Sequence, residues 1–202
     1  MSQGHYFSRD LGRPRELGRI TLWTDGKTID LLTSPGVFSY GKVDRGTIVL
    51  IDNMEVPDDG WVLDMGCGYG PLSVCASIKG SNVVGIEVNP RAAWLARKNM
   101  ARHAKGSWII ILGDLYGPVR SRFESIVCNP PIRAGRGVVA RIIQEAGKYL
   151  REDGSLQIVA RTKMGAKTLS GLMRSSLGNV QEVEKESGYR VLLSRCRGGR
   201  VD

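Results

Sequence analysis

Residues 62–72 read Val62-Leu63-Asp64-Met65-Gly66-Cys67-Gly68-Tyr69-Gly70-Pro71-Leu72. An apolar run that ends in an acid, followed by three alternating glycines and a proline, is typical of a buried strand that turns sharply into a helix. Such a turn exposes backbone N–H groups to a ligand that approaches closely. Pro71 stands where the dinucleotide fingerprint G-x-G-x-x-G requires its third glycine, so a pyrophosphate ligand is disfavoured. The acid Asp64 instead favours a ligand that carries a cationic group.

The residues around this stretch alternate between short apolar runs and helical patterns. We expect strands at residues 61–64, 82–87, 108–112, 125–128 and 155–160, and helices at 71–78, 90–104, 137–150 and 166–177. Residues 180–186 and 190–195 are expected to close the sheet as an antiparallel pair. This order predicts an α/β, Rossmann-like fold, with a mostly parallel seven-stranded sheet, helices on both faces and an antiparallel last strand.

The first 55 residues follow a different pattern. Apolar runs at residues 20–23 and 28–32 flank Asp25-Gly26, which predicts a β-hairpin. A short helix is expected at residues 46–54. We therefore expect an N-terminal extension at residues 1–55 and an α/β core at residues 56–202 that forms one compact unit.

The composition narrows the class of protein. The net charge is +9, and 20 of the 29 basic residues are arginine, the side chain that binds phosphate with two hydrogen bonds. No apolar run reaches the roughly 18 residues of a membrane span, and the polar N-terminus lacks a secretory pattern. The four cysteines contain no C-x-x-C pair and there are only two histidines, which disfavours a zinc site. These features predict a cytoplasmic protein without membrane contact or metal; a solvated basic surface is the alternative to a phosphate-bearing partner.

Two acids lie at the ends of later strands of the predicted sheet. Glu87 ends the strand at 82–87, where an acid accepts hydrogen bonds from both hydroxyls of a ribose. Asp114 follows the strand at 108–112, where it can accept a hydrogen bond from an adenine amino group, and Leu115 can pack on the ring. An ordinary strand-end acid and a turn aspartate are the alternatives.

The stretch Asn129-Pro130-Pro131-Ile132 follows the strand at 125–128. A residue that precedes proline is held extended, so this turn is rigid. The Asn129 side-chain oxygen and the Pro130 carbonyl oxygen are then two fixed acceptors at the end of the strand. Such a pair can hold both hydrogens of a planar NH2 group and direct its nitrogen at an electrophile. A rigid turn without a ligand is the alternative.

Together, residues 64–70, Glu87, Asp114 and residues 129–132 resemble the successive motifs of class I S-adenosylmethionine-dependent methyltransferases, in the form found in enzymes that methylate planar amino groups. Gly36-Val37-Phe38-Ser39 and Asp44-Arg45-Gly46-Thr47 resemble the preceding motif of the methyltransferase-small family. Its best-known members are the ribosomal RNA guanine-N2 methyltransferases. The similarity runs from about His5 to Arg190.

The resemblance implies roles for single residues. The methionine part of S-adenosylmethionine would be held by Asp64, Gly66, Cys67, Gly68 and Gly70, and closed in by Phe38, Ser39 and Thr47. Glu87, followed by Val88 and Asn89, would bind the ribose, and Asp114 with Leu115 the adenine. Asn129, Pro130, Pro131 and Ile132 would orient the target amine, which attacks the methyl carbon directly without a protein nucleophile. RNA contacts are expected from Arg120, Arg122, Arg133, Arg136 and Arg190.

One departure from the family pattern bears on the substrate. Base-methylating members usually carry an aromatic residue after Asn-Pro-Pro, whereas this chain has Ile132 followed by Arg133. The resemblance implies methylation of an exocyclic base amine, with guanine N2 of ribosomal RNA or of the small ribosomal subunit first, and adenine N6 or transfer RNA as alternatives. A protein glutamine methyltransferase and a non-catalytic RNA-binding module are the rival classes. The oligomeric state, monomer or homodimer, stays open.

Overall fold

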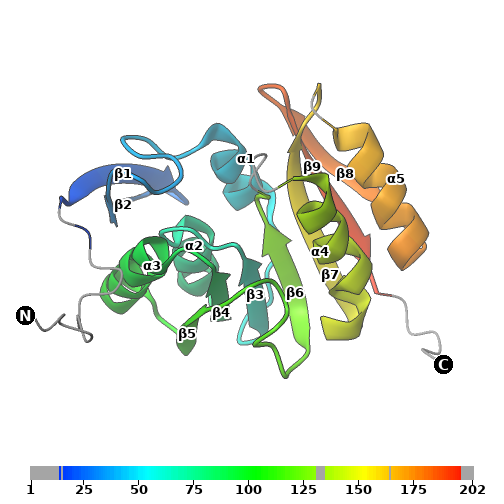
Figure 1. Ribbon diagram of the computed structural model, residues 1–202, viewed down its shortest axis with the longest axis horizontal. Helices are drawn as coiled ribbons and strands as arrows, with labels where there is room; N and C mark the ends of the chain where they lie inside the picture. Colours follow the sequence, from blue (N-terminus) through cyan, green and yellow to red (C-terminus); the bar gives the residue numbers. More distant parts are fainter. Residues whose placement is uncertain (1–13, 15, 131–134, 164, 197–202) are drawn as a thin grey trace, which may run out of the picture.

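A sheet of seven strands forms the centre of the computed structural model, which describes residues 14, 16–130, 135–163 and 165–196 (Figure 1). The strand order is β5-β4-β3-β6-β7-β9-β8. The neighbours from β5 to β7 pair in parallel, and β9 is antiparallel to both β7 and β8. The strands are β3 (Trp61–Met65), β4 (Asn82–Glu87), β5 (Trp108–Leu112), β6 (Phe123–Cys128), β7 (Leu150–Arg161), β8 (Gln181–Glu186) and β9 (Tyr189–Arg195). The α/β, Rossmann-like fold with an antiparallel last strand is thereby confirmed.

Helices cover both faces of this sheet. The helices α1 (Arg45–Asn53), α2 (Pro71–Ile78) and α3 (Pro90–His103) pack on one face, and α4 (Arg136–Tyr149) and α5 (Ala166–Leu177) on the other. Side chains alternate between these faces along each strand. In β3, Val62 packs with the first group of helices, whereas Leu63 and Met65 pack with the second. Asp64 therefore points towards α2, on the same face as Val62.

Local sequence signals explain where the helices begin. Gly70 adopts a left-handed φ of 93°, which turns the chain from the loop at residues 66–70, the glycine loop, into α2. Pro71 takes the first helical position. Asn89 caps α3, because its side-chain oxygen accepts hydrogen bonds from the N–H groups of Arg91 (2.9 Å) and Ala92 (3.4 Å), and Pro90 follows it. Among the described residues, no helix is long and apolar enough to cross a membrane.

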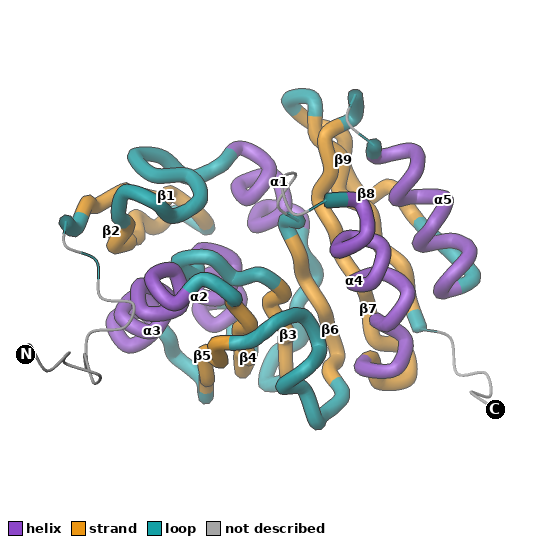
Figure 2. Tube along the Cα trace, in the orientation of Figure 1, coloured by secondary structure: helices purple, strands orange, loops and turns teal. Residues whose placement is uncertain are grey.

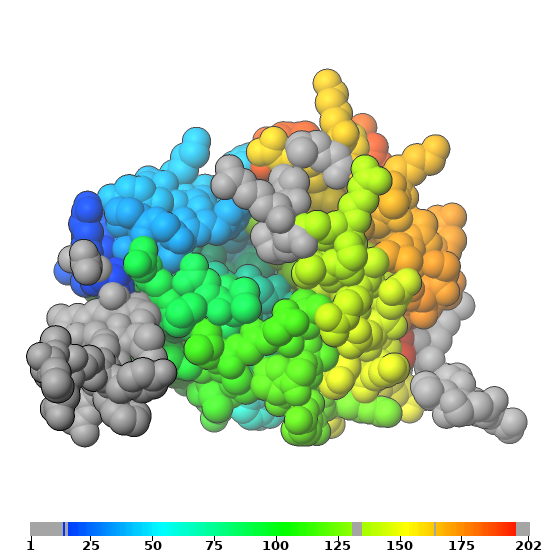
Figure 3. All heavy atoms as spheres, in the orientation of Figure 1, coloured from blue at the N-terminus to red at the C-terminus, as the bar shows by residue number. Residues whose placement is uncertain are grey.

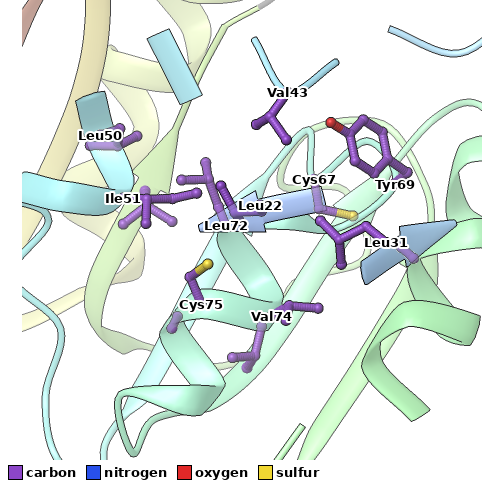
Figure 4. Packing of buried hydrophobic residues seen from close by; sticks show 14 of the residues in the cluster. Leu22, Leu31, Val43, Leu50, Ile51, Cys67, Tyr69, Leu72, Val74 and Cys75 are labelled. Carbon is purple, nitrogen blue, oxygen red and sulfur yellow. The ribbon is translucent and has the colours of Figure 1, made fainter. Parts of the chain in front are cut away.

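The N-terminal residues form a separate two-stranded sheet that shares the core of the larger one. Strands β1 (Gly18–Thr24) and β2 (Lys27–Thr33) are antiparallel, and positive φ angles at Asp25 and Gly26 make the tight turn between them. Figure 2 shows this hairpin beside α2 and α3, with the loop that leads from β2 to α1. Leu22 and Leu31 lie among side chains of the glycine loop and α2, as Figure 4 shows. The hairpin thus completes the apolar cluster on this face of the sheet.

The bounds of β6 and β7 differ from the sequence-based expectation. Strand β6 begins at Phe123 rather than residue 125, and β7 begins at Leu150 rather than residue 155. Phe123 pairs with Leu150, and a register shift follows before Ser125 pairs with Ser155. Residues 151–153, near the start of β7, are exposed and charged, which is why this part of the sequence resembles a loop.

Candidate active site

The glycine loop between β3 and α2 leaves open space next to two of its glycines. Gly66 and Gly68 have φ angles of 73° and 60°, and a Cβ atom at either position would meet no atom within 4 Å. At Gly70 a Cβ would lie 3.3 Å from Ala96 of α3, so this glycine permits close packing of the helices. The N–H groups of Gly66 and Cys67 both donate to the Ile86 carbonyl at 2.9 Å, which fixes the loop to the end of β4. A ligand can therefore approach the backbone at Gly66 and Gly68.

Glu87 lies at the end of β4, directly beside this loop. Its side chain is 8% exposed. One carboxylate oxygen, Oε2, accepts a hydrogen bond from the Gly68 N–H at 2.8 Å, and the other, Oε1, accepts one from the Asn89 N–H at 2.8 Å. These bonds hold the carboxylate in one orientation at the carboxyl edge of the sheet, where ligands bind in open α/β sheets.

Asp64 lies beneath the loop rather than on its surface. The side chain is 0% exposed, and Oδ2 accepts a hydrogen bond from the Ser73 hydroxyl at 2.6 Å. Its other oxygen, Oδ1, has no hydrogen-bond partner among the described residues. Burial, which disfavours the charged form, raises the pKa of Asp64 to about 7. Because β3 directs the carboxyl group into the interior towards α2, Asp64 lies behind the loop, and its expected role towards a cationic ligand group stays a prediction.

The other residues expected at the nucleoside side are placed in different ways. Val88 is 68% exposed, so it offers an apolar surface beside Glu87. Asn89 is the N-cap of α3, and its side-chain oxygen is used there. Asp114 is exposed, whereas Leu115 has a φ of 47° and is only 8% exposed, because it packs into the core on the α4 side. The structure thus leaves Val88 and Asp114 open to a ligand and gives Leu115 mainly a packing role.

The loop from β2 to α1 borders the same edge of the sheet. Phe38 is 58% exposed, and the Ser39 hydroxyl donates to the Lys42 carbonyl at 2.6 Å within the loop's own turn. Arg91 of α3 fastens this loop, because its Nη1 donates to the Pro35 carbonyl at 2.9 Å. Figure 3 shows that the surface is recessed between this light-blue N-terminal segment and the green segment below it. Phe38 therefore lies exposed on a loop that is bound to the start of α3.

Asn129 follows β6 and points towards the helix α1. Val127 packs on the α1 side and Cys128 on the α4 side, so the alternation of the strand continues into Asn129. The Asn129 Nδ2 donates to Asp44 Oδ2 at 3.0 Å and to Thr47 Oγ1 at 2.8 Å. The amide nitrogen is thus occupied, and Oδ1 is the atom left to accept a hydrogen bond from a ligand. Pro130 is half-buried beside it, whereas Pro131, Ile132 and Arg133 lie outside the described residues.

The cysteines at this edge are not nucleophiles. Burial raises the pKa of Cys67 in the glycine loop and of Cys128 next to Asn129 well above the usual range of a thiol. Buried thiols in such surroundings stay protonated and inert. In the part of the chain that the structure describes, no group of three or more histidine, cysteine, aspartate or glutamate side chains could hold a metal ion.

The arginines expected to bind RNA are scattered. Arg136 is exposed at the first position of α4, close after Asn129 in the chain. Arg120 and Arg122 lie in the loop that enters β6, at the strand end opposite Asn129, so they do not flank the Asn129 site. Six residues of strand separate the two ends by roughly 20 Å. Arg190 forms an ion pair with Glu182 on the neighbouring strand β8.

Three side chains that organise the site were given no role by sequence reasoning. Asp44, quoted there only as part of the stretch 44–47, contacts Asn129, and Arg91 binds the loop that carries Phe38. Asn99 of α3 is fully buried; its Oδ1 accepts from the Leu32 N–H at 2.8 Å, and its Nδ2 donates to the carbonyls of Leu32 (3.0 Å) and Tyr69 (2.8 Å). Asn99 therefore ties the hairpin to the glycine loop. Each contact joins segments far apart in the chain, and no local pattern signals it.

These residues fit S-adenosylmethionine. Gly66 and Gly68 leave room for a ligand at the backbone, Glu87 presents an oriented carboxylate for hydroxyl groups, and Val88 offers an apolar surface for a ring. The buried acid Asp64, with an oxygen that lacks a partner among the described residues, would supply negative potential to a cationic ligand group when its carboxyl group is ionised.

Comparison with known proteins places the chain in a family. The model of the methyltransferase small domain matches residues 28–193. The uncharacterized protein YbxB of Bacillus subtilis is 34% identical over 199 residues, which covers 95% of this chain and 98% of that protein. The ribosomal RNA small subunit methyltransferase C of Alcanivorax borkumensis is 34% identical over 142 residues, covering 67% of this chain and 43% of that protein.

A solved structure shows the same relationship. The 16S rRNA N2 G1207 methyltransferase of T. thermophilus, in complex with AdoMet and guanosine, superposes with a TM-score of 0.82 at 26% identity over 91% of this chain and 52% of that one. The chain thus spans about half the length of the ribosomal RNA methyltransferases it matches. The chain belongs to the methyltransferase small domain family, whose members are S-adenosylmethionine-dependent methyltransferases.

Proposed function

We propose that the protein transfers a methyl group from S-adenosylmethionine to the exocyclic N2 of a guanine in ribosomal RNA of the small subunit. The observation that carries this proposal is the orientation of Asn129. Asp44 and Thr47 occupy its amide nitrogen, so that Oδ1 is presented as an acceptor. An acceptor at this place suits a substrate that donates N–H groups, as an exocyclic amine does.

The residues of this chain act mainly by positioning. S-adenosylmethionine, when bound, would supply an electrophilic methyl group to the amine nitrogen by direct displacement, in which the sulfur–carbon bond breaks and S-adenosylhomocysteine leaves. Asn129 Oδ1 and the Pro130 carbonyl oxygen accept the two amine hydrogens and thereby direct the nitrogen lone pair away from them. After the nitrogen–carbon bond has formed, the nitrogen carries a positive charge and loses one proton. A strong base is not required for this step, because such an ammonium is acidic.

We infer the cofactor contacts from the family resemblance and from the groups that the site leaves open. The backbone at Gly66 and Gly68, together with Phe38 and Thr47, would enclose the methionine part. Glu87 would accept hydrogen bonds from the ribose, and Val88 and Asp114 would contact the adenine.

The RNA part of the proposal is supported by the relatives and by charge. Both ribosomal RNA methyltransferases compared above are named for small-subunit ribosomal RNA, and the chain carries a net charge of +9. Arg136, exposed at the start of α4, is the described arginine best placed to contact phosphates near the target. Arg120 and Arg122 would contact RNA only if it reached the opposite edge of the sheet.

Transfer of a labelled methyl group tests the proposal. The enzyme is incubated with methyl-labelled S-adenosylmethionine and either ribosomal RNA, small ribosomal subunits, transfer RNA or ribosomal protein. We expect the label in ribosomal RNA, and a fall of at least about 100-fold for Asn129→Ala at nearly unchanged cofactor affinity. Asn53→Ala, which removes an asparagine from α1 outside the site, is the matched control with normal turnover. Label confined to protein would support glutamine methylation instead, and RNA binding without transfer would support a non-catalytic module.

A further inference from the structure

The residues at the start of α1 contact the candidate active site at Asn129. Asn129, at the end of β6, donates from Nδ2 to Asp44 and to Thr47, which precede it in the chain by 85 and 82 residues. Both partners belong to the start of α1. The side chain that holds the target amine in the proposed function is therefore itself held by residues at the start of α1.

The chemistry of Asp44 decides which way the Asn129 amide faces. A side-chain amide has one accepting oxygen and one donating nitrogen, and its terminal torsion has two states of similar intrinsic energy. A carboxylate only accepts hydrogen bonds, so the amide nitrogen must face Asp44 and Oδ1 must face away. The reversed amide would present N–H groups to an incoming amine, which is also a donor. Hydrogen bonding to a carboxylate also polarises the amide and makes Oδ1 a stronger acceptor.

Asp44 is rigidly placed for this task. It is the N-cap of α1, with an extended backbone (φ −60°, ψ 138°), and its Oδ2 accepts from the Thr47 N–H at 3.1 Å. The same oxygen thus binds the helix and Asn129. A Cβ at Gly46 would lie 2.9 Å from Asp44 Oδ2 and 2.8 Å from Tyr189 Cε1, so no larger residue fits between them. Thr47 is 4% exposed, which protects the contact from competing water.

We propose that Asp44 is a positioning residue for methyl transfer, which fixes the Asn129 amide with Oδ1 towards the target amine, and that Thr47 Oγ1 is its second anchor. The inference rests on the proposed function, because it assumes an amine as the methyl acceptor. The family resemblance places Thr47 at the methionine side of the cofactor and gives Asp44 no role. In the structure the hydroxyl of Thr47 is bound to Asn129.

Two substitutions at Asp44 separate alignment of Asn129 from capping of α1. Serine is as good an N-cap as aspartate, but its hydroxyl is one bond shorter and does not reach Asn129. Asparagine keeps the cap and an oxygen acceptor at the length of the aspartate. We expect Asp44→Ser to lower kcat by about 10- to 100-fold with the dissociation constant for S-adenosylhomocysteine within about threefold of the wild type. Asp44→Asn should recover most of the rate.

Asp52→Ser is the matched control, because it removes an aspartate from the solvent side of the same helix. It should leave kcat unchanged. Turnover of Asp44→Ser within twofold of the wild type would overturn the proposal, and so would equal loss in Asp44→Asn and Asp44→Ser. If Asp44→Ser does not fold, Thr47→Val provides a second test, because it keeps the shape of the side chain but removes the hydroxyl that binds Asn129. We expect Thr47→Val to lower kcat and Thr47→Ser, which keeps the hydroxyl, to restore it.

A measurement without substrate separates this proposal from the proposed function. The side-chain N–H signals of Asn129 in a 15N–1H spectrum are assigned by their loss in Asn129→Ala. We expect two shifted, slowly exchanging signals in the wild type and in Asp52→Ser, and collapsed or fast-exchanging signals in Asp44→Ser. Unchanged Asn129 signals in Asp44→Ser would refute the alignment, whereas a wild type that methylates no RNA would refute the proposed function alone.

Discussion

Replacement of the buried Asp64 by asparagine should change how the stability of the ligand-free protein depends on pH. Burial raises the pKa of Asp64 from 3.8 to about 7. Below about pH 4 the carboxyl group is protonated in both the folded and the unfolded chain. Between about pH 4 and pH 7 the unfolded chain loses the proton while the folded chain keeps it, so stability falls as pH rises. Above about pH 7 both states are charged and the effect levels off.

The size of the effect follows from the shift. A shift of about three pKa units at about 1.4 kcal/mol each gives up to about 4 kcal/mol of unfolding free energy above pH 7. The asparagine side chain of the variant has no charge, and its oxygen can still accept from the Ser73 hydroxyl. The difference in stability between Asp64→Asn and the wild type should therefore grow in favour of the variant by up to that amount as pH rises.

Urea unfolding of both proteins without cofactor, at several values from about pH 5 to pH 8.5, measures this difference. Asp153→Asn, at an exposed site, controls for the loss of one negative charge. Stability curves of Asp64→Asn and the wild type that run parallel over this range would refute the reasoning, because the carboxyl group would then not carry a burial penalty.

Three further substitutions test the construction of the site. Glu87→Gln places an amide N–H against one of the two backbone N–H donors that the carboxylate now accepts from. We expect S-adenosylhomocysteine binding, measured by titration calorimetry, to weaken at least about tenfold. Unchanged affinity would exclude the role of this carboxylate. Gly68→Ala adds a methyl group in the space open to a ligand, at a residue with a φ of 60°. The unfolding free energy should fall by only about 1 kcal/mol, whereas most of the cofactor affinity should be lost. A loss of stability with unchanged cofactor affinity would mean that the loop faces no ligand. Asn99→Ala leaves buried backbone groups of Leu32 and Tyr69 without hydrogen-bond partners. The unfolding free energy should therefore fall by roughly 3 kcal/mol and Tm by about 10 °C. A Tm within about 2 °C of the wild type would contradict this account.

The strand and helix order of the core could be predicted because local signals punctuate it. The glycine loop and Pro71 mark the start of α2, and Asn89-Pro90 marks the start of α3, so their neighbouring strands follow from apolar runs. The first residues of β7 could not be predicted in this way. Arg151 and the two acids after it are exposed, and they lie in the irregular stretch between the Phe123–Leu150 and Ser125–Ser155 pairs, so only the pairing of Leu150 with β6 shows that the strand begins before them.

The site could be predicted residue by residue but not as an arrangement. Glu87 and Asn129 were predicted as site residues because Glu87 ends one strand and Asn129 follows another at the carboxyl edge of a parallel sheet, where the ends of strands meet. The burial of Asp64 and the orientation of Asn129 depend on side chains from other elements, Ser73 and Asp44. Arg120 and Arg122 are close to Asn129 in sequence, but they precede β6 whereas Asn129 follows it. The length of β6 therefore separates the two arginines from Asn129, at opposite edges of the sheet.

Identification of the methylated nucleoside tests the central claim most directly. Small ribosomal subunits or their RNA are incubated with the enzyme and S-adenosylmethionine, the RNA is digested to nucleosides, and these are separated by liquid chromatography and identified by mass spectrometry. We predict N2-methylguanosine with the wild type and none with Asn129→Ala. Methylation at N6 of adenosine, methylation found only in protein, or N2-methylguanosine formed equally by Asn129→Ala would contradict the account.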